Sequence, residues 1–330
     1  MADIARMAEV DISTVSRALA NSPKVTDDTK EKIRKLVEET GYVVNHGARM
    51  LRNQRSGQIL VMLPNIAATF FPEVVLGIED ELQEHQFTVV VGSTRNDKER
   101  EDMLARQLLN GAADGMILMT GRLPDELLAQ PSYDRLVVGV SRTVPNADIP
   151  QVNIDNRQAA ITAVKHLFEG GHRRIAHLSG PIGSPTFQAR VDGYLHAMDL
   201  AGASAQSTVI NSSGFNLAAG ATAMTRLLES AILPTAIICA SDEMAIGAMD
   251  VAQKAGLSIP EDISFIGFDD LSFSSALHPS LSTIRIPRYE MGRIGARMLL
   301  QNLDSSRKKP ENIIMGHELI ERRSSRVHGL

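Results

Sequence analysis

The stretch Ser-Thr-Val-Ser-Arg-Ala-Leu at residues 13–19 shapes the expectations for the first fifty residues of the chain. Ser13 or Thr14 is expected to begin a helix, because a short hydroxyl side chain accepts hydrogen bonds from free backbone amides. Val15 and Leu19 lie four residues apart and therefore share one face of that helix. The turn-forming residues 21–23, Asn-Ser-Pro, are expected to end it. The stretch thus predicts a short helix with one apolar face and one polar face.

Two further short helices are expected around this one. Asp3 is expected to cap the first helix, Thr26 is expected to cap the third, and Gly41 is expected to end the third. Such small helices bury little surface alone, so the three should pack into one unit of about 45 residues. The apolar side chains expected to face the interior of this unit are Ile4, Ala5, Ala8, Ile33, Leu36 and Val37.

A helix, a tight turn and a second helix are typical of a helix-turn-helix, whose second helix lies in the major groove of DNA. Arg17 would lie in the first turns of that helix, where an arginine can form a bidentate contact with guanine. The net charge is −5 overall, but residues 1–55 carry +2 and the remainder −7. A basic head on an acidic body fits a local DNA footprint. The same features also fit any small helical hairpin with a solvated face.

Alternating strands and helices are expected from Gln58 onward, after a polar, basic linker over residues 45–57. Short apolar runs separated by amphipathic stretches are typical of buried parallel strands and their covering helices. Two consecutive arrays predict two doubly wound subdomains with a ligand cleft at the strand C-termini. The expected domains are 1–44, 45–57 and 58–330, giving an α plus α/β fold. The expected strands are 59–63, 88–91, 116–119, 136–140, 175–178, 236–239 and 264–267, and the expected helices are 72–84, 98–110, 158–168, 186–201, 217–228 and 243–254.

Composition points to a cytoplasmic protein without disulfides. The chain has 330 residues, of which 43% are hydrophobic and 22% charged, and it lacks an apolar run that could cross a bilayer. Its N-terminus lacks the apolar core of an export signal. The single cysteine, Cys239, lies in an apolar run and is expected to be a buried thiol.

Catalytic motifs do not stand out in the sequence. It contains no Walker lysine motif, no Gly-x-Ser-x-Gly elbow and no metal-ligand spacing among its nine histidines. The sequence therefore predicts no enzyme, no metal and no cofactor. An exported sugar-binding protein remains an alternative, because the body alone fits that class as well.

Several polar side chains follow the expected strands, where a ligand cleft should open. They include Asp242 and Asp269, each directly after a strand, together with an arginine after another strand. Carboxylates and an arginine suit hydroxyl groups, and aromatic residues in loops suit a ring face, so a sugar- or nucleoside-like ligand is expected. Helix capping or contact between domains would explain the same residues equally well. The full candidate set is Phe70, Phe71, Arg142, Thr186, Arg190, Phe215, Asp242 and Asp269.

The order of several motifs resembles the lactose-repressor (LacI) family over essentially the whole chain. The motifs are Asp-Ile-Ala at 3–5, the stretch at 13–19, Gly-Tyr at 41–42, Asp-Asn at 155–156, Gly-His-Arg-Arg-Ile at 171–175, Ser-Gly-Pro at 179–181, Ser-Asp-Glu-Met-Ala at 241–245, Gly-Phe-Asp-Asp at 267–270 and Glu-Arg-Arg-Ser at 321–324. The resemblance implies a helix-turn-helix head and a two-subdomain body like that of periplasmic binding proteins.

The resemblance implies that the head and a hinge helix at residues 45–52 bind operator DNA. In this family a hinge leucine, here Leu51, wedges between base steps of the minor groove, and contacts to the bent DNA offset the cost of unstacking. Val43 and Val44 depart from the family, which often has proline after Gly-Tyr. The implied DNA-binding residues are Ser13, Thr14, Ser16, Arg17, Asn21, Asn45, Ala48, Arg49, Leu51 and Arg52.

The resemblance also implies a small-molecule effector and a dimer. Phe71, Arg190 and Asp269 match positions that contact the effector in many members, whereas the other candidates match positions of more variable role. Ser184 stands where the purine repressor has a base-reading arginine, which weighs against a free purine base. Residues 121–124 and 287–290 look most like the cytidine-responsive branch, so a nucleoside and a plain sugar both stay open. The expected partners are a pseudo-palindromic operator, the effector and a second copy of the chain.

Overall fold

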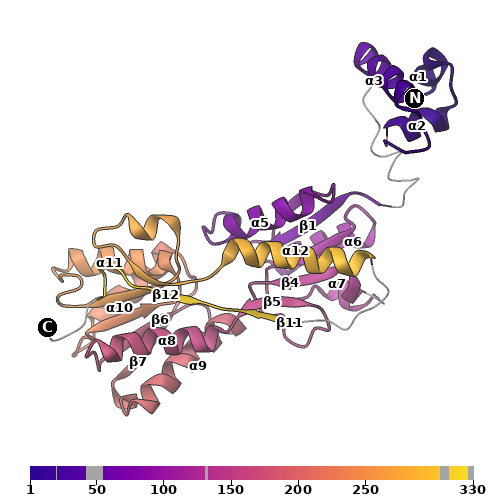
Figure 1. Ribbon diagram of the computed structural model, residues 1–330. Helices are drawn as coiled ribbons and strands as arrows, with labels where there is room; N and C mark the ends of the chain where they lie inside the picture. Colours follow the sequence, from indigo (N-terminus) through magenta and orange to yellow (C-terminus); the bar gives the residue numbers. More distant parts are fainter. Residues whose placement is uncertain (20, 42–54, 131–132, 305–311, 326–330) are drawn as a thin grey trace. The chain divides into compact units, whose positions relative to one another are not determined.

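The computed structural model describes residues 1–330 except 20, 42–54, 131–132, 305–311 and 326–330. It divides into two compact units, Met1–Arg55 and Ser56–Leu330 (Figure 1). We call the first unit the head and the second the body. The predicted hinge residues Asn45, Ala48, Arg49, Leu51 and Arg52 lie outside the described residues.

The head consists of three helices around a small apolar core. They are α1 (Ala2–Ala8), α2 (Ile12–Leu19) and α3 (Asp27–Thr40). Val15 from α2 and Ile33 from α3 are fully buried, and together with Ile4 from α1 they hold the three helices in one unit. Gly41 ends α3 with a φ of 62°, as predicted.

Three details of the predicted head are wrong. Helix α2 begins at Ile12, before Ser13 and Thr14. Helix α1 begins at Ala2, so Asp3 lies in its first turn and pairs with Arg6 instead of capping the helix. Thr26 does precede α3, but its hydroxyl pairs with the hydroxyl of Thr29 rather than with a backbone amide. A carboxylate in the first turn still favours the helix through the helix dipole, so α1 forms without the cap.

The body contains two six-stranded sheets, each flanked by helices. Subdomain 1 has a parallel sheet of order β11-β5-β4-β3-β1-β2, and subdomain 2 has one of order β12-β10-β9-β8-β6-β7, in which β12 alone runs antiparallel. Such strands are buried on both faces, which explains their continuous apolar runs. The strands are β1 (Gln58–Leu63), β2 (Thr88–Ser93), β3 (Gly115–Leu118), β4 (Val137–Val140), β5 (Gln151–Ile154), β6 (Ile175–Ser179), β7 (Ser207–Asn211), β8 (Ala236–Cys239), β9 (Ser264–Asp269), β10 (Ser282–Arg285), β11 (Asn312–Met315) and β12 (Glu318–Ile320).

Six helices of the body follow the predicted amphipathic stretches to within two residues at each end, whereas the helices at residues 125–128 and 288–304 were not predicted. Cys239 in β8 is buried, as expected, and burial raises the pKa of its thiol. The helices are α5 (Phe71–Gln83), α6 (Lys98–Leu109), α7 (Asp125–Leu128), α8 (Asn156–Glu169), α9 (Pro185–Leu200), α10 (Leu217–Leu228), α11 (Asp242–Lys254) and α12 (Arg288–Asp304).

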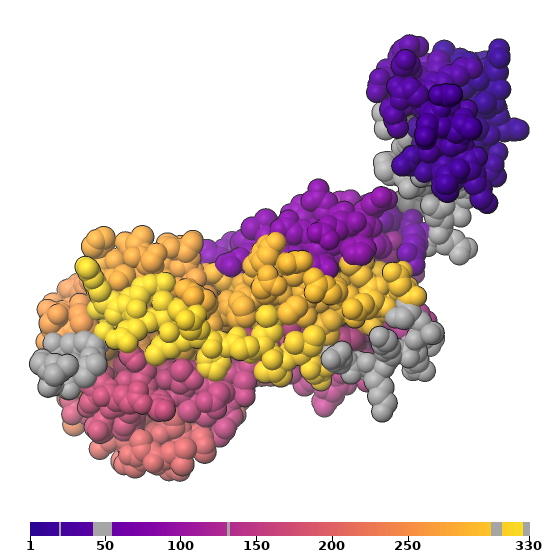
Figure 2. All heavy atoms as spheres, in the orientation of Figure 1, coloured from indigo at the N-terminus to yellow at the C-terminus, as the bar shows by residue number. Residues whose placement is uncertain are grey.

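The expectation of two consecutive arrays is wrong for the last part of the chain. After β10 the chain returns to subdomain 1, where α12 packs against α5 and β11 pairs with β5. Gly77 of α5 faces the backbone of Tyr289 so closely that a Cβ there would collide with it. The chain then returns to subdomain 2 as β12. Figure 2 shows these C-terminal residues, in orange and yellow, on the surface of both subdomains. The chain therefore passes between the two subdomains three times instead of once.

Candidate functional site

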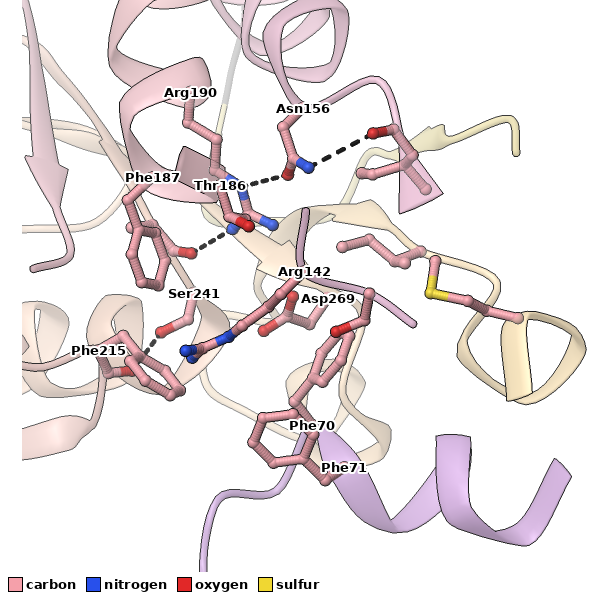
Figure 3. A pocket seen from close by; sticks show the side chains of 15 residues that line it. Phe70, Phe71, Arg142, Asn156, Thr186, Phe187, Arg190, Phe215, Ser241 and Asp269 are labelled. Carbon is pink, nitrogen blue, oxygen red and sulfur yellow. Dashed lines mark hydrogen bonds between the residues drawn. The ribbon is translucent and has the colours of Figure 1, made fainter. Parts of the chain in front are cut away.

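A cavity lies where the two sheets of the body face each other, and about 480 Å³ of space lies among its lining atoms, including the solvent at its open mouth. Residues that directly follow the C-terminal ends of β4 and β8, and the last residues of β5 and β9, contribute to its lining, as expected for doubly wound sheets. Figure 3 shows the lining side chains, which combine four phenylalanines with a small set of polar groups.

Seven of the eight predicted effector residues line this cavity. They come from distant parts of the sequence, and the two subdomains supply them together. The seven are Phe70, Phe71, Arg142, Thr186, Arg190, Phe215 and Asp269.

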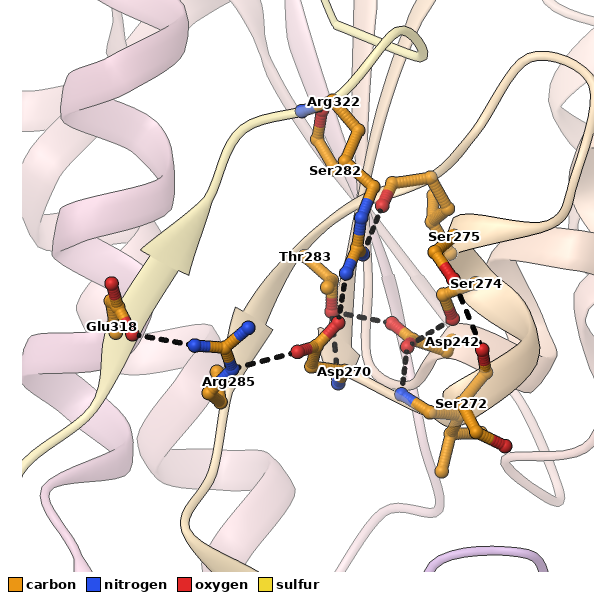
Figure 4. A network of polar contacts seen from close by, with 12 residues as sticks. Asp242, Asp270, Ser272, Ser274, Ser275, Ser282, Thr283, Arg285, Glu318 and Arg322 are labelled. Atoms are coloured by element: carbon orange, nitrogen blue, oxygen red, sulfur yellow. Dashed lines mark hydrogen bonds and ion pairs between the residues drawn. The ribbon is translucent and has the colours of Figure 1, made fainter.

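Asp242 is the exception, because it was predicted to line the cavity and does not. Its carboxylate is buried behind the cavity, where Oδ2 accepts from the backbone N of Leu271 at 2.8 Å and from Ser274 Oγ at 2.6 Å. Oδ1 accepts from Thr283 Oγ1 at 2.5 Å (Figure 4). Burial raises the pKa of Asp242 to about 6, against the effect of these hydrogen bonds. The carboxylate therefore joins α11 to the segments around β10 instead of meeting a ligand.

Arg190 of α9 is held in a fixed orientation at the cavity wall. Its Nε donates to Asn156 Oδ1 at 2.9 Å and its Nη1 donates to the carbonyl oxygen of Ala240 at 2.5 Å. Its guanidinium carbon lies 4.1 Å from the ring centroid of Phe268, a cation–π contact. Burial lowers the pKa of Arg190 to about 10, so the side chain remains cationic at neutral pH. The cavity thus contains a positioned hydrogen-bond donor.

Asp269 is the last residue of β9 and its carboxylate faces the cavity (Figure 3). Its φ is 112°, a region that a residue with a Cβ adopts only at a cost in energy. Within the described part of the chain, no side chain or backbone group donates a hydrogen bond to this carboxylate. Burial raises the pKa of Asp269 to about 8, although Arg190 counteracts the rise. A buried acceptor without a partner and on a strained backbone is what a ligand hydroxyl could satisfy.

The raised pKa of Asp269 predicts a pH-dependent stability. The folded chain keeps a proton that the unfolded chain loses near its ordinary pKa of 3.8. The stabilising contribution is therefore complete below about pH 4 and is lost as the pH rises through about 8. Relative to Asp269→Asn, the free energy of unfolding of the unchanged chain should fall by up to about 1.4 kcal/mol per pH unit within this window. Urea denaturation of both proteins at several pH values measures this, and parallel curves would contradict the raised pKa.

Aromatic side chains form the apolar part of the cavity wall. Phe187 and Phe215 lie with ring centroids 5.5 Å apart, and Phe70 and Phe71 meet edge to face at 5.4 Å. Such surfaces suit the apolar face of a sugar or the flat face of a base. The cavity can therefore hold a ligand with a ring and several hydroxyl groups.

Sequence reasoning missed several of the lining residues. Asn156 and Ser141 follow β5 and β4, and β5 was not among the predicted strands. Phe187 lies in the first turn of α9, where an apolar residue is expected to face the core. Ser241 caps α11 by accepting from the backbone N of Met244 at 3.1 Å, while its hydroxyl donates to the carbonyl oxygen of Phe215. The types of these residues do not indicate a binding site in the sequence, because the residues come together only in the folded chain.

In the head, α2 presents part of the predicted DNA-binding set to solvent. Ser13, Arg17 and Asn21 are exposed, and Thr14 is partly exposed. Ser16 was predicted to face the operator. Its side chain is only 6% exposed and packs within the head instead. The reason is geometric, since Ser16 lies next to Val15 on the flank of α2 that turns toward the core.

Two features bear on other classes of protein. The described residues contain no group of three or more His, Cys, Asp or Glu side chains arranged to hold a metal ion. Among the same residues no helix is long and apolar enough to cross a membrane.

Comparison with known proteins gives consistent matches over both units. Residues 1–45 match the family described as bacterial regulatory proteins, lacI family, and residues 56–323 match periplasmic binding proteins and sugar binding domain of LacI family. The chain is 36% identical over 328 residues to the HTH-type transcriptional repressor CytR of Escherichia coli (strain K12), covering 99% of this chain and 96% of that protein.

Two solved structures are similar over nearly the whole chain. The lac repressor dimer bound to operator and the anti-inducer ONPF superimposes with a TM-score of 0.87 at 25% identity, covering 98% of this chain and 97% of that one. The complex of the transcriptional regulator CelR with cellobiose gives a TM-score of 0.74 at 27% identity, covering 97% and 98%.

Proposed function

The chain belongs to the LacI family of bacterial regulatory proteins, and from that premise we propose that it is a transcriptional repressor controlled by a sugar- or nucleoside-like effector. The head binds operator DNA and the cavity of the body binds the effector. A sugar-binding protein without a DNA-binding role is not favoured, because residues 1–45 match the DNA-binding part of the family. The family relatives are regulators, so we propose no catalytic role, and we propose the cytoplasm as the place of action.

The observation that carries the effector proposal is that the side chains of Asp269 and Arg190 both line a cavity walled by phenylalanines. The Asp269 carboxylate accepts hydrogen bonds from ring hydroxyls, and the Arg190 guanidinium donates to a ring or hydroxyl oxygen. The solved complex of CelR contains cellobiose, a sugar, in a similar fold. Thermal-shift screening of the full chain against sugars and nucleosides tests this proposal, and the absence of any stabilising ligand in either class would contradict it.

The head is proposed to bind DNA through the exposed side of α2. Ser13, Thr14 and Arg17 lie on its solvent side and within its first turns, where they can reach phosphates and base edges. A two-fold dimer places two such heads on the half-sites of a pseudo-palindrome.

Arg17→Ala is expected to weaken binding to the operator by about 1–3 kcal/mol, because a bidentate arginine–guanine contact is lost. Binding to random DNA should change much less, since a base contact contributes only at the specific site. Gel-shift titrations with both kinds of DNA measure the two losses. Arg34→Ala, on the exposed side of α3 where Arg34 pairs with Glu31, is the matched control. Equal losses on operator and random DNA would assign Arg17 to the phosphate backbone.

Coupling between the two sites is proposed to run through closure of the subdomains. Thr69, just before α5, donates from its backbone N and its hydroxyl to Oε1 of Glu243 on α11, at 3.1 and 2.5 Å. This contact joins subdomain 1 to subdomain 2 beside the cavity, so it depends on their separation. A ligand that bridges the cavity will shift the same equilibrium only if it binds one arrangement better. Calorimetric titration of an effector with and without operator tests the coupling, and identical affinities would contradict it.

A further inference from the structure

Arg142 is partly buried and differs from the two buried arginines near the cavity, Arg190 and Arg288. It directly follows Ser141, which lies after β4 with a φ of 67°, and its guanidinium extends into the cavity (Figure 3). Its guanidinium carbon lies 5.4 Å from the ring centroid of Phe215 on subdomain 2. In the described ranges no oxygen accepts a hydrogen bond from this guanidinium, and no carboxylate forms an ion pair with it.

Two neighbouring arginines, unlike Arg142, are held by acceptors of the protein, although Nε of Arg288 has no partner among the described residues. Arg190 donates to Asn156 and Ala240, and Arg288 pairs with Glu73 and donates to the carbonyl oxygen of Asp270. Both are bound by acceptors of the protein itself. Arg142 therefore has five N–H donors pointing into a ligand site with no acceptor of its own.

The cavity also has more positively charged than negatively charged side chains in its lining, which favours an anionic ligand. Two guanidiniums, those of Arg142 and Arg190, face one carboxylate, that of Asp269. Burial lowers the pKa of Arg142 to about 10, and the positive charge of Arg190 contributes, yet Arg142 remains protonated at neutral pH. A partly buried charge without a protein partner loses some of its solvation, and a ligand group of opposite charge offsets that loss.

We propose that the effector carries an anionic group, a phosphate or a carboxylate, and that Arg142 binds it. This rests on the proposed function, because it specifies the effector of the same cavity. A planar guanidinium forms two parallel hydrogen bonds with either group, which gives both affinity and orientation. The anion lies beside Phe215, while Asp269 and Arg190 hold the hydroxyl-bearing ring. The effector class is therefore a sugar phosphate, a sugar acid or a nucleotide, in preference to a neutral sugar or nucleoside.

The test uses the full chain and matched pairs of probes that differ only in charge. The pairs are ribose with ribose 5-phosphate, glucose with glucose 6-phosphate, glucose with gluconate, and cytidine with cytidine 5′-monophosphate, and inorganic phosphate is added alone. Calorimetry is expected to show that the anionic member of at least one pair binds about 10- to 100-fold more tightly than the neutral member. The phosphate and carboxylate arms then distinguish a phosphate ester from a sugar acid.

Variants test whether Arg142 causes the preference for the anionic probe. Arg142→Gln should remove most of the anion's advantage, so its affinity falls by a larger factor than that of the neutral member. Arg226→Gln, on the exposed surface of α10, is the matched control and should keep the wild-type preference. Arg142→Met should raise the melting temperature of the ligand-free chain, because it removes a partly buried charge that has no acceptor in the described protein.

Three results would overturn the proposal. One is that no anionic probe binds more tightly than its neutral partner. Another is that the anion's advantage survives in Arg142→Gln. The third is that Arg142→Met melts below the unchanged chain, which would make Arg142 a structural residue. If neutral probes bind and require Asp269, the proposed function stands while the anion proposal fails. If no probe of either charge binds, both fail.

Discussion

Asp269→Asn is expected to bind the effector about 100-fold more weakly, a loss of about 3 kcal/mol. The carboxylate has two acceptor oxygens and no hydrogen-bond donor from the described protein, so the effector's hydroxyls are its expected partners. Hydrogen bonds from the effector's hydroxyls favour the ionised form of Asp269 and so lower its raised pKa on binding. Such charge-assisted hydrogen bonds are about twice as strong as neutral ones, and an amide replaces one acceptor with a donor. Calorimetric titration with a ligand found by thermal shift measures the loss. Operator binding in the absence of effector should stay close to that of the unchanged chain.

The control for this variant is Asp192→Asn, an exposed aspartate on α9 that lies outside the cavity. It removes the same charge and should leave effector affinity unchanged. The coupling must also be reciprocal, so the factor by which the effector changes operator affinity equals the factor by which the operator changes effector affinity. An Asp269→Asn protein that keeps its full effector affinity would show that the carboxylate does not bind the ligand.

Asp242→Ala is expected to lower the free energy of unfolding of the body by about 3–5 kcal/mol. The substitution leaves the amide of Leu271 and the hydroxyls of Ser274 and Thr283 buried without their acceptor. Each buried donor without a partner costs about 1–3 kcal/mol, and the space left by the carboxylate adds to this. The three partners come from the segment after β9 and from β10, so the loss affects the edge of subdomain 2.

Urea denaturation followed by circular dichroism measures this loss, with Asp250→Ala as the matched control. Asp250 lies on the same helix, where it is exposed and pairs with Lys254, so its removal should cost less than about 0.5 kcal/mol. Effector affinity measured well below the denaturation midpoint should change far less in Asp242→Ala than in Asp269→Asn. A stability equal to that of the control would mean that the polar contacts of Asp242 contribute little.

Local patterns in the sequence were sufficient for most helices and for seven of the strands, β1 to β4, β6, β8 and β9. The period of the apolar residues in α2, α6 and α10 and the continuous apolar runs of β1 and β8 depend only on near neighbours along the chain. The resemblance to a family, carried by ordered motifs, supplied the two-unit architecture, and the matches over residues 1–45 and 56–323 confirm it. Five strands were missed. Strands β7, β11 and β12 are short and partly exposed, and β5 and β10 carry polar residues at buried positions, so all five have a weak apolar signal.

Tertiary structure decided which polar residues share the cavity and which do not. Asp242 and Asp269 look alike in sequence, since each stands at the C-terminal end of a buried strand. The return of the chain through β10 places Thr283 and Ser274 around one carboxylate, whereas the end of β9 leaves the other facing the cavity. The same holds for Arg142 and Arg190, of which only the second has protein acceptors. A sequence pattern specifies the periodicity of one element, but the partners of a buried charge come from distant segments, and only their packing determines whether a protein group or a ligand satisfies it.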